Sequence, residues 1–390
     1  MEVLDASDQR AVERAAGLLR AGRLVGMPTE TVYGLAVNAQ DDAAVAGVFE
    51  AKGRPRFDPL IVHAATAESA WGWVASKMGW PAEWASDGRG YGQVMGMAEE
   101  LAAAFWPGPL TLVLPVREGA VSRLVTSGLG TVGLRVPGHP VARELIASAG
   151  VPVAAPSANR FGGISPTRAG HVVEELDGRI DAVLDGGPCD RGLESTVVGF
   201  GTEKADGDCQ SGGARLCVEV LRLGSVSVER LSGVLEGSGH SLRVHRGTSR
   251  PDGLSAEARG AAQPAPGMLD RHYAPRTPMV LVDEMSEVPT GVERLRRALG
   301  PGALSSPEQW GVFLAVLPMI DPLVPELPVG LVEEPRLEAL VRSAAVFFDR
   351  LRALDARGLG GIVAVRASDY GLGRAMNDRL ERGAIQAGGV

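Results

Sequence analysis

The chain has 390 residues and a mass of 40.6 kDa, which is long enough for two or three domains with separate cores. Apolar residues make up 45% and charged residues 22%, a globular composition that excludes disordered, fibrous and membrane-embedded proteins. The net charge of −8 disfavours non-specific binding to nucleic acid or to a membrane, although a cleft can still be locally basic.

The termini and cysteines bear on where the protein works. The chain starts with the acidic segment MEVLDASDQR and contains no apolar stretch of 18 residues, so we expect a cytosolic protein without a membrane span. The sequence has three cysteines, Cys189, Cys209 and Cys217. They contain no CxxC pair and are odd in number, which argues against a disulfide scaffold and a structural zinc site.

The breaker residues divide the chain into a large domain at 1–237, a linker at 238–277 that is rich in Gly, Pro, Ser and Arg, and a smaller domain at 278–390. In the large domain, short apolar runs predict strands at 24–27, 60–63, 110–116, 131–136, 151–155, 182–184 and 195–200. Helical patterns occupy 11–21, 42–52, 141–149 and 166–176. We therefore expect an α/β domain with a mostly β core.

Two further stretches complete the chain-order prediction. Residues 70–100 hold four tryptophans and favour a surface insertion of two turn-rich loops whose aromatic rings pack locally. In the smaller domain, strands at 279–282, 312–317 and 361–365 alternate with helices at 291–299, 336–357 and 374–384. This alternation is typical of a small, doubly wound, Rossmann-like sheet.

The first candidate site follows the strand GRLVGM, in the segment from Pro28 to Leu35. Its threonine hydroxyls, Thr31 among them, and its free backbone N–H groups suit a small anionic or zwitterionic ligand. A plain strand-to-helix turn with a threonine N-cap explains the same pattern.

The second candidate site is AKGRPRFDPLIVH, at the end of the helix predicted over 42–52. Lys52 there can simply offset the helix dipole. However, Lys52, Arg54 and Arg56 lie within five positions, and such crowding of like charge favours a bound anion, best a polyphosphate. His63 ends the following strand and is either a boundary residue or part of the site.

The third candidate site is the strand TVGLRVP. Strand alternation places Thr131, Gly133 and Arg135 on the face opposite the core. Arg135 either faces solvent or binds a carboxylate in bidentate fashion.

The fourth candidate site combines VAAPSAN, which holds Ala155, Ser157 and Asn159, with the turn GGISPT. Ser165 before Pro166 predicts a helix N-terminus with a serine cap, which is suited to an anion. The sequence has no P-loop, GxGxxG fingerprint, HExxH or nucleophile elbow, so a nucleotide would be held in another way and Mg²⁺ would arrive with its phosphates.

Together these segments resemble a known family. KGR at 52–54 and SAN at 157–159, with PTETVYGL, FWPGPLTLVLP, LRVPGHP and ESTVV, are similar to the YrdC-domain family of L-threonylcarbamoyladenylate synthases. The segment APGMLDRHYAP and the C-terminal α/β domain resemble the long, two-domain form. This resemblance implies a twisted, mostly β fold around a basic cavity, and condensation of L-threonine, bicarbonate and ATP into threonylcarbamoyl-AMP and pyrophosphate. The product would pass to a tRNA threonylcarbamoyltransferase complex, with at most a weak contact to tRNA itself.

The resemblance also implies roles for individual residues. Lys52 and Arg54 would be catalytic. The threonine and bicarbonate pocket would be lined by Thr31, His63, Arg135, Ala155 and Ser195. ATP would be bound by Arg54, Asp58, Thr131, Ser157, Asn159, Ser165 and Arg222, with Tyr273 of the linker closing over it. Asp58 departs from the family pattern and, as a carboxylate near phosphate, would need Mg²⁺ or an arginine to offset its charge.

Two other functions fit parts of the pattern. The first is a YrdC-type enzyme that handles a carbamoyl-adenylate without threonine. The second is a non-catalytic RNA-binding module that uses the same basic cleft.

Overall fold

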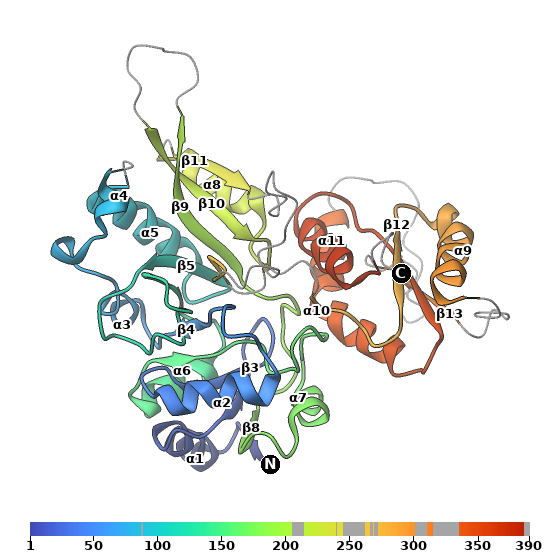
Figure 1. Ribbon diagram of the computed structural model, residues 1–390, viewed down its shortest axis with the longest axis horizontal. Helices are drawn as coiled ribbons and strands as arrows, with labels where there is room; N and C mark the ends of the chain where they lie inside the picture. Colours follow the sequence, from blue (N-terminus) through green and yellow to red (C-terminus); the bar gives the residue numbers. More distant parts are fainter. Residues whose placement is uncertain are drawn as a thin grey trace.

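The computed structural model describes residues 1–86, 89–204, 214–238, 240–244, 262–265, 268, 272–300, 310–314 and 335–385. They form two parts, each built on its own sheet (Figure 1). Most of the predicted linker at 238–277 lies outside the described residues.

The large sheet has eleven strands in the order β1-β8-β2-β3-β7-β4-β6-β5-β9-β10-β11 and mixes parallel with antiparallel pairs. The strands are β1 (Glu2–Asp5), β2 (Val25–Met27), β3 (Gly34–Asn38), β4 (Ile61–His63), β5 (Leu110–Pro115), β6 (Thr131–Arg135), β7 (Val153–Ala154), β8 (Ala182–Asp185), β9 (Thr196–Lys204), β10 (Ala214–Arg222) and β11 (Ser241–Val244). This mixed sheet confirms the expected mostly β core.

Helices cover both faces of this sheet. Successive side chains of a strand point to opposite faces, and here both faces carry apolar side chains that need cover. The α-helices are α1 (Gln9–Arg20), α2 (Asp42–Lys52), α3 (Ala67–Trp71), α4 (Ala82–Ser86), α5 (Tyr91–Phe105), α6 (Pro140–Ala149), α7 (Ala169–Leu176) and α8 (Val228–Glu236), with a 3₁₀ turn η1 (Lys77–Gly79). In β3, Leu35 and Val37 pack in the same core as α2 and α5, whereas Ala36 packs with α1 and α6.

The smaller sheet is parallel, with the order β12-β14-β13. Its elements are β12 (Met279–Val282), η3 (Met285–Glu287), α9 (Val288–Leu299), β13 (Trp310–Leu314), α10 (Pro335–Asp355), β14 (Gly361–Val365) and α11 (Leu372–Gly383). Helix α9 packs on one face, against Val280 and Val363, and α10 and α11 pack on the other. The predicted doubly wound arrangement is therefore confirmed in these residues.

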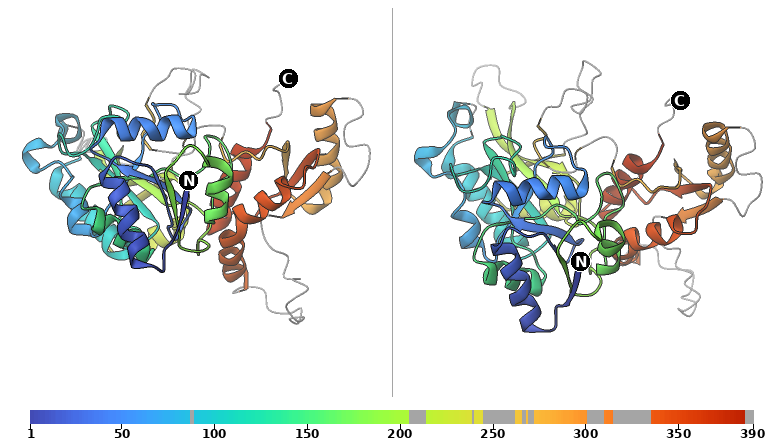
Figure 2. Two further views of the ribbon diagram at one scale, coloured as in Figure 1. Left: turned by 90° about the horizontal axis from the view of Figure 1, so that it is seen from below. Right: turned by 60° about the horizontal axis from the view of Figure 1, so that its bottom comes forward.

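The two parts share one apolar core. Phe347 and Phe348 of α10 pack in a cluster that also contains Val32, Ile164 and Leu193 of the large part. In Figure 1 α10 and α11 accordingly face the large part, whereas α9 lies at the outer edge, and Figure 2 shows the same order from two other sides. The C-terminal part is thus packed onto the large part over an apolar surface.

Some sequence predictions were wrong locally. Residues 70–100 are not two loops: they include the end of α3, all of α4 and most of α5. The rings do pack locally, with Trp71 stacked on Trp106 and Trp80 edge-on to Trp84. The helix expected from residue 166 begins at Ala169. No helix in the described residues is long and apolar enough to cross a bilayer.

Candidate active site

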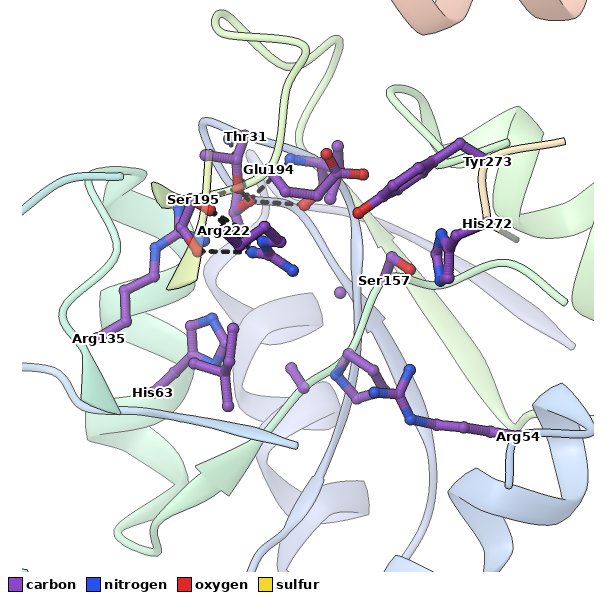
Figure 3. A pocket seen from close by; sticks show the side chains of 16 residues that line it. Thr31, Arg54, His63, Arg135, Ser157, Glu194, Ser195, Arg222, His272 and Tyr273 are labelled. Atoms are coloured by element: carbon purple, nitrogen blue, oxygen red, sulfur yellow. Dashed lines mark hydrogen bonds between the residues drawn. The ribbon is translucent and has the colours of Figure 1, made fainter. Parts of the chain in front are cut away.

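A single pocket collects most of the predicted site residues (Figure 3). The predicted residues that line it are Thr31, Arg54, His63, Arg135, Ala155, Ser157, Ser195, Arg222 and Tyr273. In Figure 3, Thr31, Ser195 and Arg135 lie toward one side of the hollow, and Arg54, His272 and Tyr273 toward the other. Segments far apart in the sequence thus form a continuous wall.

Strand pairing explains why these residues meet. β4 and β6 are parallel, with His63 directly beside Arg135, and β7 runs antiparallel on the other side of β4. His63 and Arg135 thus end neighbouring strands side by side, whereas Ala155, which follows the antiparallel β7, lies beside the start of β4, where its N–H donates to the Ile61 carbonyl at 2.9 Å. All three residues line one hollow. This finding overturns the alternative in which Arg135 faces solvent.

Arg135 is fixed by three acceptors. Its Nη2 donates to Glu30 Oε1 at 2.6 Å and to Thr31 Oγ1 at 2.9 Å, and its Nε donates to the Gly108 carbonyl at 3.2 Å. Burial alone would raise the pKa of Glu30, but the charge and hydrogen bond of Arg135 lower it below its ordinary value. The guanidinium is therefore held in one orientation, with a carboxylate as its partner.

His63 is a neutral group in this wall. Burial, reinforced by the charge of Arg135, lowers its pKa to about 3. A neutral imidazole next to a guanidinium can accept or donate a hydrogen bond without adding positive charge.

Ser195 and Arg222 form a second polar group in the pocket. Arg222 Nη2 donates to the Ser195 carbonyl at 2.9 Å and to Ser195 Oγ at 3.1 Å, and that Oγ lies 2.8 Å from Thr111 Oγ1. The parallel pairing of β5 with β9 brings Thr111 and Ser195 together. Thr111 was not predicted, because it lies inside an apolar strand with no pattern that marks it.

Arg54 lines the opposite side and already has an anion beside it. Its Nη2 lies 2.9 Å from Asp58 Oδ2, and its Nε donates to the Asp58 carbonyl at 3.1 Å. Asp58 is fully buried and does not line the pocket. The crowded basic charge is therefore offset in part by the chain itself, so the crowding alone does not require a phosphate.

Lys52 holds the backbone of the SAN segment. Its Nζ donates to the carbonyls of Ser157, at 2.6 Å, and of Asn159, while Asn159 Nδ2 donates to the Gly163 carbonyl at 3.0 Å. Burial, with the charge of Arg54 adding to it, lowers the pKa of Lys52 well below its ordinary value. Lys52 and Asn159 do not line the pocket; they support the loop that does.

Two more predicted residues lie outside the pocket. Thr131 begins β6 and lines a separate small hollow with Leu60 and Pro264. Ser165 is not a helix cap: α7 begins after it with Arg168 as its N-cap, and the Ser165 hydroxyl donates to Glu194. The threonine N-cap considered for Pro28–Leu35 is also absent, because Thr29 and Thr31 bond each other and β3 follows, not a helix.

The linker residues His272 and Tyr273 close one side of the pocket. Tyr273 has a left-handed φ of 61°, is buried, and stacks on Phe348 with ring centroids 5.8 Å apart. A non-glycine residue holds this backbone conformation only when its surroundings fix it. Tyr273 is therefore anchored by the C-terminal part.

Glu194 and His272 also line the pocket but were not predicted to do so. Both belong to motifs that were noticed, ESTVV and HYAP, so their positions could have suggested them. No group of three or more His, Cys, Asp or Glu side chains able to hold a metal occurs in the part of the chain that the structure describes.

Comparisons with known proteins fit this architecture. Residues 17–206 match the Sua5/YciO/YrdC family model, which is described as "Telomere recombination", and residues 226–385 match a model described as "Threonylcarbamoyl-AMP synthase, C-terminal domain". The chain is 34% identical to the threonylcarbamoyl-AMP synthase of Bacillus subtilis over 384 residues, which is 96% of this chain and 92% of that relative. The chain belongs to the Sua5/YrdC family.

Another family member, the threonylcarbamoyl-AMP synthase of Pyrococcus abyssi, is 34% identical over 393 residues, 98% of this chain and 96% of its own length. The crystal structure of P. abyssi Sua5 complexed with L-threonine aligns with a TM-score of 0.72 at 33% identity and covers 98% of both chains. The two-part Sua5 fold is thus shared over essentially the whole chain.

Proposed function

We propose that this chain is a threonylcarbamoyl-AMP synthase that condenses L-threonine, bicarbonate and ATP. The observation that carries the proposal is the convergence of Arg135, His63 and Ser195 with Arg54 and Tyr273 on one pocket. The relatives that match nearly the full chain carry this activity in their names, and the P. abyssi structure contains L-threonine.

The reaction needs no protein nucleophile. The threonine amine adds to bicarbonate with loss of water and gives a carbamate. A carbamate oxygen then attacks the α-phosphorus of ATP, and the bond to the bridging oxygen breaks to release pyrophosphate. The protein contributes by holding the two anions in line and by stabilising the charge on the phosphates.

We assign the amino-acid side of the pocket to Thr31, His63, Arg135, Ala155 and Ser195. Arg135 would bind the threonine carboxylate, because it lines the pocket and its contacts with Glu30, Thr31 and Gly108 hold the guanidinium in one orientation. Neutral His63 would accept or donate a hydrogen bond beside it.

We assign the nucleotide side to Arg54, Ser157 and Arg222, with Tyr273 covering it. Lys52 and Asn159 would act by fixing the Ser157 loop. Asp58, Thr131 and Ser165 do not line the pocket. Thr131 would reach ATP only if its separate hollow joined the pocket, and Ser165 only if its hydrogen bond to Glu194 broke. Glu30, Asp58 and Glu194 are each paired with an arginine, so Mg²⁺ would come bound to the triphosphate. We further propose that the enzyme works in the cytoplasm and passes its product to a tRNA threonylcarbamoyltransferase complex.

The test measures pyrophosphate release and separates the nucleotide products by chromatography, with each substrate omitted in turn. We expect threonylcarbamoyl-AMP and pyrophosphate only when ATP, bicarbonate and L-threonine are all present. An Arg54→Ala preparation with unchanged melting temperature controls for contaminating ATPases. Equal pyrophosphate release without threonine would instead indicate a carbamoyl-adenylate enzyme, and no release under any condition would favour a non-catalytic module.

A further inference from the structure

Two arginines of the C-terminal part are connected to the pocket residue Glu194, Arg379 directly and Arg352 through Ser165. Arg379 of α11 is fully buried, and its Nε and Nη2 donate to Glu194 Oε2 at 3.2 Å and 3.1 Å. Glu194 itself lines the pocket and directly precedes Ser195. A pocket carboxylate is therefore oriented by a residue from the other part of the molecule.

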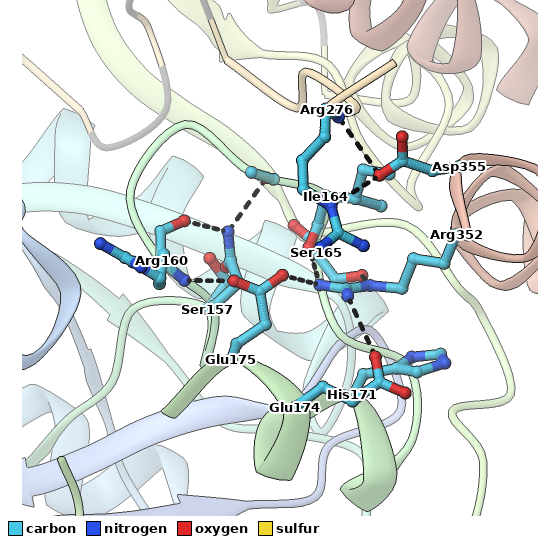
Figure 4. Close-up of polar contacts among 12 residues, drawn as sticks. Ser157, Arg160, Ile164, Ser165, His171, Glu174, Glu175, Arg276, Arg352 and Asp355 are labelled. Atoms are coloured by element: carbon cyan, nitrogen blue, oxygen red, sulfur yellow. Dashed lines mark hydrogen bonds and ion pairs between the residues drawn. The ribbon is translucent and has the colours of Figure 1, made fainter. Parts of the chain in front are cut away.

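The second arginine holds the loop on the other side of Glu194. Arg352 of α10 donates through Nε to the Ser165 carbonyl at 3.3 Å and through Nη2 to the Ile164 carbonyl and to Glu175 Oε1, the latter at 2.8 Å. Glu175 in turn accepts the backbone N–H of Arg160 at 3.2 Å (Figure 4). Arg352 thus contacts one end of the loop 160–165 directly and the other end through Glu175.

Ser165 connects the two arginines. Its hydroxyl donates to Glu194 Oε1 and its carbonyl accepts from Arg352, so Glu194 and the loop move together. This loop follows directly on the SAN segment that ends at Asn159. The chain of contacts runs from α10 and α11 through Ser165 and Glu194 to the pocket.

We propose that Arg379 and Arg352 are positioning residues, through which the C-terminal domain sets the geometry of Glu194 and the 160–165 loop for catalysis. The inference rests on the proposed function and extends it by giving the C-terminal domain a task in that reaction. Two guanidinium donors on Glu194 Oε2 and the Ser165 hydroxyl on Oε1 fix this carboxylate in direction. A displacement of about 1 Å in a site of this kind can cost about 100-fold in rate. If Arg379 is removed, Glu194 remains as a buried charge without its main partner and has to reorient.

A double-mutant cycle measures whether Arg379 acts through Glu194. The cycle compares Arg379→Met, Glu194→Gln and the double variant by kcat/KM for ATP in the pyrophosphate-release assay. We expect each single variant to lose about tenfold and the double variant to lose no more than Arg379→Met alone, because Glu194→Gln breaks only a contact that Arg379→Met has already removed. Arg379→Met also removes the contacts of Arg379 with Asp378 and with the Tyr273 ring, so its own loss can be the larger of the two. Losses that multiply in the double variant would overturn the proposal.

Matched variants separate positioning from general weakening of the domain contact. Arg168→Met removes another ion pair between the two parts, that of Arg168 Nε with Asp349 Oδ1 at 2.7 Å, but touches no pocket residue. We expect Arg168→Met to keep kcat/KM within twofold and Arg352→Met to lose about tenfold. Arg379→Lys, which keeps the charge, should recover part of the loss. Equal activity of the Arg168 and Arg352 variants would refute the inference.

Melting temperatures show which variants are folded. If Arg379→Met does not fold, the activities of Arg379→Lys and Arg352→Met decide whether the arginines position the site. The wild-type enzyme separates the two levels of the proposal. Wild-type protein without threonine- and bicarbonate-dependent activity would contradict the proposed function. An active wild type with unaffected Arg379 and Arg352 variants would contradict only the positioning role.

Discussion

His63 lies beside Arg135 in a fully buried part of the pocket wall, where its imidazole has to stay neutral. Its pKa of about 3 lies below the ordinary value of 6.5, which the unfolded chain has. Below pH 6.5 the unfolded state therefore binds a proton that the folded state does not, and stability falls as the pH drops from 6.5 toward 3. Above pH 6.5 both states are neutral and His63 contributes no pH dependence.

We predict that the His63→Gln variant has a flatter acid limb in its stability profile. Between about pH 7.5 and about pH 5, the wild type should lose about 2 kcal/mol more than the variant in the free energy of unfolding. Urea unfolding at several pH values measures this difference. His272 is buried and also has a lowered pKa, so it contributes equally to both proteins and cancels in the comparison. Parallel acid limbs would contradict the prediction.

Among single residues, those that end or follow a strand and belong to a recognisable motif were predicted from the sequence, such as Arg135 and Ser157. Partners that are far apart in sequence could not be predicted in this way. Arg379 and Glu194 are 185 positions apart, and no local pattern marks Arg379 among the many arginines of the chain. Asp58, in contrast, was expected to need Mg²⁺ or an arginine to offset its charge, and Arg54, its i,i+4 neighbour, is that arginine.

The turn between β10 and α8 shows how an element positions a side chain. A Cβ on Gly224 would lie 2.4 Å from the Thr196 nitrogen and 2.5 Å from the Glu194 carbonyl oxygen, both of them backbone atoms that cannot easily move. Only glycine therefore allows this segment to lie against the start of β9. That close approach keeps Arg222, at the end of β10, on Ser195.

We predict that Gly224→Ala lowers the free energy of unfolding by about 1–3 kcal/mol, because overpacking has to be relieved by a backbone shift. It should also raise the KM for threonine, because Arg222 and Ser195 separate. The matched control is Gly233→Ala within α8, where the added Cβ meets nothing within 4 Å and should stabilise the helix by about 0.5–1 kcal/mol. Chemical unfolding and steady-state kinetics measure both effects, and equal stability changes in the two variants would rule the explanation out.

The elements themselves were predicted best where an apolar run had clear breakers, as in α2 with Gly53 behind it, which adopts the expected left-handed conformation. Helix α5 was missed because Gly92 and Gly96 interrupt its pattern, and burial of its apolar face outweighs their low propensity. Strand β3 was missed because its glycine start looked like the end of a turn. The helix expected at Ser165 was misplaced because serine before proline is only a local signal, which the contact with Glu194 overrides.

At the scale of the whole molecule, the two parts meet through a shared apolar core around Tyr273. Phe348 is fully buried there and stacks on the Tyr273 ring. Phe313 lies in the same cluster but contacts Phe347 edge-on, away from Tyr273. The two phenylalanines thus support the interface in different ways.

We predict that Phe348→Ala and Phe313→Ala each lower the free energy of unfolding by about 3–5 kcal/mol, through lost burial and the cavity left behind. Only Phe348→Ala should raise the KM for ATP by about tenfold or more, because Tyr273 loses the ring that holds its strained backbone in place. Denaturation and kinetics on both variants measure this split. An equal change in KM for the two would show that Tyr273 needs no support from Phe348.

The position of Arg379 in α11 has a consequence for synthesis on the ribosome. Helix α11 follows every other described element in the chain, so the wall around Glu194 stays incomplete until translation has passed residue 379. A message that ends between codons 273 and 379 encodes every side chain of the pocket, up to Tyr273, but not the guanidinium that orients Glu194. Shortened products of this gene would then retain the catalytic groups without their alignment.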